Sequence, residues 1–176
     1  MPTPRPFITI WVYRCRVPEP LDESALAELL PGTWSVAATT FPMWLSGDRR
    51  LPKFDYGLIS RSPLVLSDDV SFLTRADERK HILGRDTFSK GRFVWRGKGL
   101  LGVVSSRWTV AGMGGDGAVV AIRFAKTIAT PAGIDILVRD DAGVEARSVV
   151  AGASTDFSLT PEDFASLTWL RVEASS

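Results

Sequence analysis

Alternating apolar and polar residues dominate the chain from residue 33 onward. Successive side chains on a strand point to opposite faces, so this alternation is typical of strands with one buried face. The pattern predicts strands at 33–40, 70–75, 92–96, 103–111, 118–126 and 134–139. These segments recur at roughly ten-residue spacing with no helix between them, which indicates an antiparallel sandwich or a closed barrel.

The N-terminal part carries different signals. Residues 7–13 (FITIWVY) are rich in β-branched and aromatic side chains and lie between prolines, which predicts an additional strand within an extension at 1–20. Residues 21–30 place apolar side chains on one helical face, and Asp22 is suited to cap the first turn. We therefore expect a short helix immediately before the first long strand.

A C-terminal section at 140–176 follows the last strand of the alternating pattern. Residues 140–153 have only loosely helical spacing. Thr160, with Asp163 three residues later, matches a capping box and predicts a short helix. Residues 168–172 then predict a closing strand.

Composition limits the class of protein. The chain has 176 residues, which fits one domain at 1–176, since domains commonly hold roughly 100–200 residues. With 21 Lys and Arg against 20 Asp and Glu, nucleic acid is not the expected partner. No apolar run approaches the roughly 18–20 residues of a membrane-spanning helix. The unpaired Cys15 and the absence of an export signal lead us to expect a cytoplasmic protein.

One short motif carries a family resemblance. Gly32-Thr33-Trp34 follows the predicted helix directly, and Arg139 ends the strand at 134–139. In order and spacing, residues 21–173 resemble the lipocalins, of the calycin β-barrel group. The resemblance implies an all-β, eight-stranded antiparallel up-and-down barrel that is open at one end and holds a small apolar molecule. It also implies that Trp34 and Arg139 pack together as structural residues near the closed end.

The sequence departs from that family pattern in two places. No T-D-Y-like motif precedes Ile134, and the predicted strand at 7–13 lies outside the usual plan. The additional strand would serve as an edge strand, a lid or a contact in a homodimer.

Aromatic side chains supply most of the candidate ligand contacts, because they offer large apolar area with little rotamer freedom to lose. Residues 41–45 form an apolar run before a turn signal, so they lie at the barrel mouth or fill the core. Tyr56 either orients a ligand or keeps its tip in water, and Arg96 is either a polar anchor or solvated. The predicted ligand contacts are Phe41, Trp44, Tyr56, Phe72, Trp95, Arg96, Trp108 and Phe124.

Asp135 is the acid of interest, because it interrupts an otherwise apolar strand (GIDIL). The two-residue period places it on the face opposite Ile134 and Ile136, and we expect it on the solvated exterior. If the faces are reversed, Asp135 lines the cavity together with Arg107 and Arg123. It would then join Tyr56 as a candidate catalytic acid or base.

Several chemistries are disfavoured. The chain has one histidine, His81, in a stretch that predicts a solvated turn entering a strand, and Cys15 has no base nearby in sequence. This argues against triad hydrolases and metal-dependent redox chemistry. The segment at 97–99 (GKG) lacks the surrounding pattern of a phosphate loop. We therefore expect neither a metal nor a cofactor.

Two functions from different classes remain, and a third would apply if the barrel were filled. The first is binding of a small hydrophobic molecule by a carrier or sequestering protein. The alternative is a cofactor-independent cyclase or isomerase of the pericyclase type, which folds a polyketide-like or polyene substrate in natural-product biosynthesis. A filled barrel would instead indicate an interaction protein that docks through Trp11 and residues 41–45. Binding is favoured, because no group of residues demands chemistry.

Overall fold

The computed structural model describes residues 21–128 and 131–172. The predicted strand at 7–13, with Trp11 and Cys15, lies outside these residues. Within the described part, no helix has the length and apolar character needed to cross a membrane.

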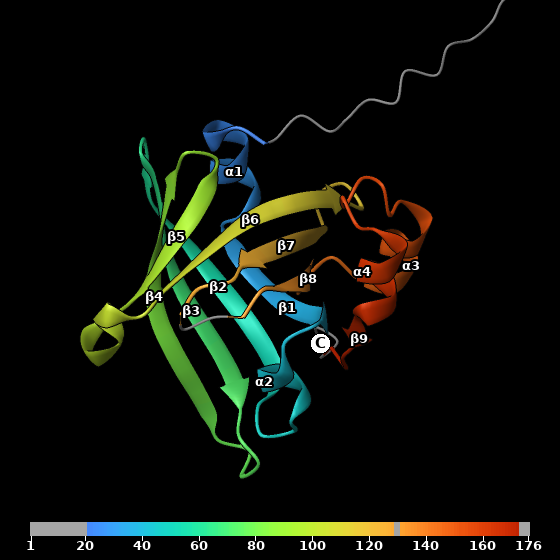
Figure 1. Ribbon diagram of the computed structural model, residues 1–176, viewed down its shortest axis with the longest axis horizontal. Helices are drawn as coiled ribbons and strands as arrows, with labels where there is room; N and C mark the ends of the chain where they lie inside the picture. Colours follow the sequence, from blue (N-terminus) through green and yellow to red (C-terminus); the bar gives the residue numbers. More distant parts are fainter. Residues whose placement is uncertain (1–20, 129–130, 173–176) are drawn as a thin grey trace, which may run out of the picture.

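Eight strands form a closed antiparallel barrel (Figure 1). The strands are β1 (Gly32–Thr39), β2 (Arg50–Arg61), β3 (Leu64–Leu73), β4 (Arg79–Ser89), β5 (Arg92–Gly97), β6 (Ser105–Gly114), β7 (Val119–Ala125) and β8 (Gly133–Arg139). Each of β2 to β8 pairs with the next along the chain, and β1 pairs with both β8 and β2. The predicted closed barrel is confirmed, and the sandwich alternative is wrong.

Strand β1 closes the barrel because its two halves have different partners. Its first half pairs with β2 from Gly32 to Ser35, and Trp34 to Thr39 pair with β8. A register shift between Val36 and Ala38 separates the β8 pairings of the two halves. The end of β1 also pairs with β9 (Thr168–Trp169), which lies outside the barrel circuit.

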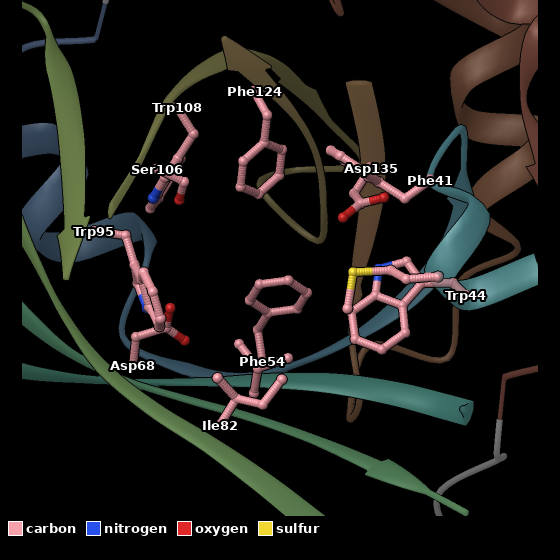
Figure 2. Close-up of a pocket in the computed structure, with 12 residues that line it drawn as sticks. Phe41, Trp44, Phe54, Asp68, Ile82, Trp95, Ser106, Trp108, Phe124 and Asp135 are labelled. Carbon is pink, nitrogen blue, oxygen red and sulfur yellow. The ribbon is translucent and has the colours of Figure 1, made fainter. Parts of the chain in front are cut away.

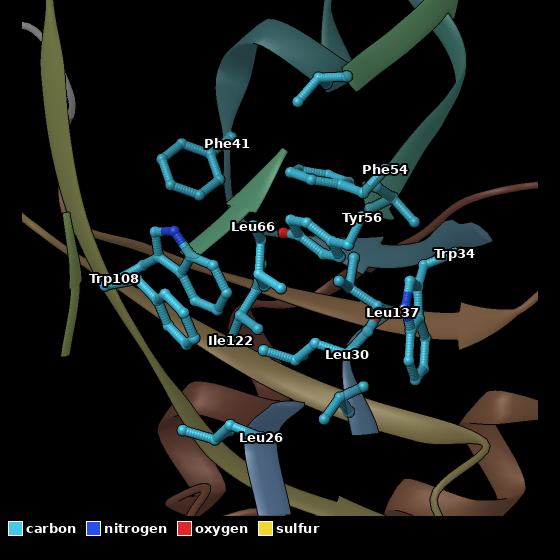
Figure 3. Close-up of a cluster of buried hydrophobic side chains, with 14 of the residues drawn as sticks. Leu26, Leu30, Trp34, Phe41, Phe54, Tyr56, Leu66, Trp108, Ile122 and Leu137 are labelled. Atoms are coloured by element: carbon cyan, nitrogen blue, oxygen red, sulfur yellow. Dashed lines mark hydrogen bonds between the residues drawn. The ribbon is translucent and has the colours of Figure 1, made fainter. Parts of the chain in front are cut away.

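One end of the barrel is sealed by helix α1 (Glu23–Leu29). Asp22 caps this helix, as the sequence predicts, by accepting a hydrogen bond from the Ala25 amide at 2.8 Å. Leu26 and Leu30 are buried in the barrel core (Figure 3). The Trp34 indole donates to the carbonyl of Leu30 at 2.8 Å, so the helix is tied to β1.

The guanidinium of Arg139 lies 4.3 Å from the ring centre of Trp34. It also donates hydrogen bonds to the carbonyls of Leu29 and Pro31. One arginine therefore joins the end of β8 to the ring on β1 and to the end of α1 at the sealed end.

The opposite end carries α2 (Pro42–Leu45), the short helix between β1 and β2 (Figure 1). The predicted loop at 41–45 is thus one helical turn that begins at a proline. A 3-10 helix at Gly99–Val103 connects β5 to β6.

A second layer covers the outside of β7, β8 and β1. It consists of α3 (Ala146–Gly152), α4 (Pro161–Ser166) and β9 (Figure 1). The predicted capping box is present, since Thr160 and Asp163 exchange side-chain-to-backbone hydrogen bonds. The buried side chains between this layer and the barrel include Ile134, Ile136 and Phe157.

This second layer overturns the prediction for Asp135. Strand β8 is buried on both faces, because its outward residues Ile134 and Ile136 pack under the C-terminal layer. The apolar pair therefore points out of the barrel, and Asp135 points in with 1% of its surface exposed. Arg107 is exposed, and Arg123 forms an ion pair outside the barrel, so the two arginines do not follow Asp135 into the cavity.

Candidate functional site

A cavity of about 150 Å³ lies inside the barrel near α2 (Figure 2). Every strand from β2 to β8 contributes at least one side chain to its wall. The lining residues are Phe41, Met43, Trp44, Phe54, Asp68, Val70, Ile82, Trp95, Ser106, Trp108, Phe124 and Asp135. Met43 is 37% exposed and marks the mouth of the cavity.

Stacked rings fix the floor of this cavity. Trp108 is sandwiched between Phe93, at 4.3 Å between ring centres, and Tyr56, at 5.9 Å. Its indole nitrogen donates to the carboxyl of Asp86 at 2.7 Å. Below this level the barrel is filled by the buried side chains that surround Leu66 (Figure 3). The cavity therefore occupies only the α2 half of the barrel.

Trp95 reaches the cavity because residue 84 is a glycine. A Cβ atom at Gly84 would lie 2.1 Å from the indole nitrogen of Trp95, so any side chain would displace the ring. Gly84 pairs with Asp68 across β3 and β4. The indole thus lies across β4 toward Asp68, and the two side chains are neighbours in Figure 2.

Three carboxyl groups are buried inside the barrel. Asp68, Asp86 and Asp135 are exposed by 4%, 0% and 1%. Asp86 accepts from Trp108, and Asp135 accepts from the hydroxyl of Thr39. Oδ1 of Asp68 has no hydrogen-bond partner among the described residues.

Burial raises the pKa of each of these carboxyls, because a low-polarity interior disfavours the charged form. The pKa of Asp86 and the pKa of Asp135 rise to about 7. The pKa of Asp68 rises well above its ordinary value, through burial and then through the negative charge of Asp86. The Tyr56 pKa is also raised, mainly by burial. Near neutral pH these acids therefore act as both hydrogen-bond donors and acceptors.

The structure brings together most of the predicted ligand contacts. Phe41, Trp44, Trp95, Trp108 and Phe124 all line the cavity. They come from the α2 region and from β5, β6 and β7, three strands that pair in sequence order, and the closed barrel places the α2 region at the same cavity.

Three predicted contacts lie elsewhere. Tyr56 is 2% exposed and lies beneath the cavity, with its ring stacked on Trp108 rather than with its tip in water. Phe72 packs against Trp44 at 6.1 Å between ring centres, outside the lining set. Arg96 is exposed on the outer face, because the alternation that turns Trp95 inward turns its neighbour outward. Tyr56, Phe72 and Arg96 therefore lie outside the cavity lining, and their contacts with a ligand stay predictions.

Sequence reasoning missed two interior acids, Asp68 and Asp86. The sequence does carry a signal for Asp68. Apolar side chains alternate along β3 at Leu64, Leu66 and Val70, and Asp68 occupies the inward position between the last two. His81, predicted in a turn, lies within β4 with its Nδ1 2.9 Å from Asp69 on the outside of the barrel.

No protein-family model matches the chain, and a search of curated proteins finds no match. Solved structures do resemble it. Lobster apocrustacyanin A1 is 11% identical, with a TM-score of 0.59 over 88% of this chain and 87% of that one. Apocrustacyanin C2 is 10% identical, with a TM-score of 0.60 over 86% of each chain. The siderocalin Ex-FABP is 12% identical, with a TM-score of 0.55 over 82% of this chain and 95% of that one.

At sequence identities of 10% to 12%, the similarity to these structures shows the fold alone. The closed antiparallel barrel together with these neighbours shows a lipocalin-like, calycin-type fold, as the Gly32-Thr33-Trp34 motif predicts.

Proposed function

We propose that this lipocalin-like barrel binds a compact hydrophobic molecule in its cavity, as a carrier or sequestering protein. The observation that carries the proposal is the cavity of about 150 Å³ lined by aromatic rings in a barrel that is otherwise filled. Apolar pockets with a few polar groups are the usual form of small-molecule sites. A dry cavity of about 150 Å³ accommodates a molecule of the size of benzene.

The fold neighbours support a binding role in general terms. The siderocalin is described as a protein that functions through dual ligand specificities. The proposal for this chain rests on its own cavity, whose volume favours a single-ring compound over a long polyene or polyketide chain.

The first test is a calorimetric titration of the protein with 2-phenylethanol, a neutral single-ring probe. Gly84→Ala places a methyl group where the Trp95 indole lies, so the ring is pushed into the cavity and affinity falls about tenfold or more. Gly57→Ala is the matched strand control, since its Cβ meets only the Ser67 side chain. Equal binding by both variants overturns the placement of the ligand in this cavity, and failure of this probe together with its amine and carboxylate analogues overturns the proposal.

A second measurement identifies the natural ligand. The protein purified from its own host and analysed by native mass spectrometry is expected to retain one small molecule. Gly84→Ala prepared in the same way is expected to retain less of it than Gly57→Ala. Equal retention by the two variants places the retained molecule outside the cavity.

An isomerase or cyclase that needs no cofactor is the second candidate. Asp68 and Asp135 lie on opposite sides of the cavity (Figure 2), which suits proton donation and removal on one substrate. The molecule recovered from the host is incubated with fresh protein and followed by chromatography and mass spectrometry. Conversion that Asp135→Asn abolishes without loss of binding supports catalysis, whereas an unchanged molecule supports binding alone.

Two further parts of the proposal rest on the sequence alone. A cytoplasmic location is proposed from the unpaired Cys15, and a homodimer is proposed through the strand expected at 7–13. Light scattering on the full chain and on a Trp11→Glu variant tests the second part. A dimer that the substitution dissociates supports it, and a monomer in both samples contradicts it.

A further inference from the structure

The ionisable side chains that line the cavity are all acidic in the described part of the chain. They are Asp68 and Asp135, and no lysine, arginine or histidine among the described residues lines the cavity. A third carboxyl, Asp86, lies directly behind the wall against Trp108. The described interior therefore offers a ligand two carboxyl groups and no cation.

Three cationic side chains of the described residues have partners that do not line the cavity. Arg49 lies over the ring of Phe72, with 5.0 Å from its guanidinium carbon to the ring centre. Lys53 pairs with Asp140 at 2.6 Å. Arg123 pairs with Asp163 at 2.8 Å. None of these residues neutralises the wall.

Asp68 is the group that points to a ligand. It is 4% exposed, lines the cavity and leaves its buried Oδ1 without a hydrogen-bond partner in the described part of the chain. Two more buried polar atoms among the described residues have no partner at hydrogen-bond distance, the indole nitrogen of Trp95 and Oδ2 of Asp86, and both side chains influence the pKa of Asp68. Of these residues, Asp86 lies behind the wall, whereas Asp68 and Trp95 line the cavity. Unsatisfied buried polar atoms are costly, so Oδ1 of Asp68, which is an acceptor, is suited to an occupant that donates a hydrogen bond to it.

The surrounding rings suit a positive charge. Trp44 and Trp95 line the same cavity, and the face of an indole attracts cations more strongly than other aromatic rings do. No cluster of three or more acidic, histidine or cysteine side chains in the described residues is arranged to hold a metal ion. An organic cation fits these surroundings better than a metal ion.

We propose that the cavity binds a compact organic amine as its ammonium cation, with the charge beside Asp68 and the apolar part against Trp44 and Trp95. The inference rests on the proposed binding function and specifies the class of ligand. An ammonium group donates to Oδ1 of Asp68, and Asp135 supplies a second acceptor across the cavity. Charge-assisted bonds of this kind are stronger than bonds between neutral groups.

Three single-ring probes that differ in charge provide the test. These are 2-phenylethylamine, its neutral isostere 2-phenylethanol, and phenylacetate, each titrated by calorimetry near pH 7.5. The amine is expected to bind about tenfold or more tightly than the alcohol, and phenylacetate most weakly. Equal or tighter binding of the alcohol overturns the amine inference and leaves the proposed function intact. Failure of all three probes overturns both.

Substitutions of the two carboxyl groups in the cavity wall test where the ammonium group of the ligand lies. Asp68→Asn is expected to weaken the amine about tenfold or more and to leave the alcohol within about threefold. Asp69→Asn is the matched control, because Asp69 is the next residue of β3 and its side chain contacts His81 outside the barrel. Asp135→Asn provides a second variant should Asp68→Asn fail to fold. Unchanged amine affinity in a folded Asp68→Asn or Asp135→Asn protein contradicts the inference.

The dependence on pH gives an independent readout. The titratable groups facing Asp68 are Asp86 from β4, Tyr56 from β2 and Asp135 from β8, with Asp69 beside it on β3. Burial raises the pKa of the interior carboxyls, so an ammonium ion that needs them charged displaces protons on binding. Amine affinity therefore rises as the pH rises through about 7, where Asp135 ionises, whereas alcohol affinity does not. Calorimetry in buffers of different ionisation enthalpy counts the released protons, and a release of none contradicts the inference.

Discussion

Trp34 shows how one residue fixes the sealed end of the barrel. Its ring is fully buried, its indole N–H donates to Leu30, and the guanidinium of Arg139 covers its face. The same arginine donates to the carbonyls of Leu29 and Pro31 at the end of α1. Removing the ring therefore opens a large void and also leaves polar groups without their partners.

Trp34→Ala is accordingly expected to lower the free energy of unfolding by about 3–5 kcal/mol, as large-to-small substitutions in cores do. The measurement is urea denaturation followed by circular dichroism. Trp169→Ala serves as the control, because Trp169 lies outside the barrel and is only partly buried. Comparable losses in the two variants would contradict the role assigned to Trp34.

Trp108 contributes to the stability of the fold as well as lining the cavity. From sequence, Trp95→Ala and Trp108→Ala both predict weaker ligand binding with little loss of stability. Trp108 is 2% exposed, stacked between two rings and bonded to Asp86, so its loss also costs stability. Trp95 is only half-buried, so Trp95→Ala is still expected to weaken ligand binding with little loss of stability.

The outer layer formed by α3, α4 and β9 is held at the scale of elements by close backbone contact. At Gly112 of β6, a Cβ atom would lie 1.9 Å from the carbonyl oxygen of Asp156 and 2.5 Å from the Cα atom of Phe157. Phe157 is fully buried in the cluster between the layer and the barrel. The segment before α4 can therefore approach β6 only over a glycine.

Gly112→Ala is expected to push residues 156–157 off the barrel and to lower the melting temperature by several degrees, since about 1 kcal/mol corresponds to about 2–4 °C at this chain length. Differential scanning fluorimetry measures the shift, and limited proteolysis reports cleavage within 140–160. Gly102→Ala is the control, because its nearest foreign atom is 3.8 Å away. Equal melting temperatures and equal protease resistance would show that the contact does not hold the layer.

Strands with strong two-residue alternation were predictable from sequence, and strands without that alternation were not. Strands β5, β7 and β8 lie within about a residue or two of their predicted bounds, the precision that element ends allow. Strands β2 and β4 were not predicted as strands. Most of β4 is exposed, so its charged stretch lacks the apolar period. Pairing with β3 and β5 defines it instead.

The C-terminal layer sets the limit for predicting the site. The two-residue period fixes which residues share a face of β8, but not which face is inside, because both faces are covered. Asp135 was assigned to the exterior for that reason. Five of the seven predicted aromatic contacts line the cavity, because rings at alternating positions tend to pack inward, whereas Tyr56 and Phe72 also pack inward but against other rings. The position of Trp95 additionally depends on Gly84, a contact between strands that local sequence does not reveal.

Across the whole molecule, the interior carboxyls link folding to pH. The pKa values of Asp86 and Asp135 rise from an ordinary 3.8 to about 7 in the folded protein because of burial. Between these values the folded state holds more protons than the unfolded state. The free energy of unfolding therefore falls as the pH rises from about 4 to about 7, and the contribution levels off above that range.

Asp135→Asn removes one of these proton-binding groups and keeps an oxygen that accepts from Thr39. Its melting temperature is expected to fall less than that of the unaltered protein between about pH 5 and about pH 8. Asp163→Asn is the control: the ion pair with Arg123 lowers the Asp163 pKa below 3.8, so its contribution changes only under more acidic conditions. Thermal unfolding of the three proteins across this pH series measures the slopes. An Asp135→Asn slope as steep as that of the unaltered protein would mean that Asp135 stays ionised inside the barrel. The interior would then carry a fixed negative charge, and amine binding would release no proton from this residue.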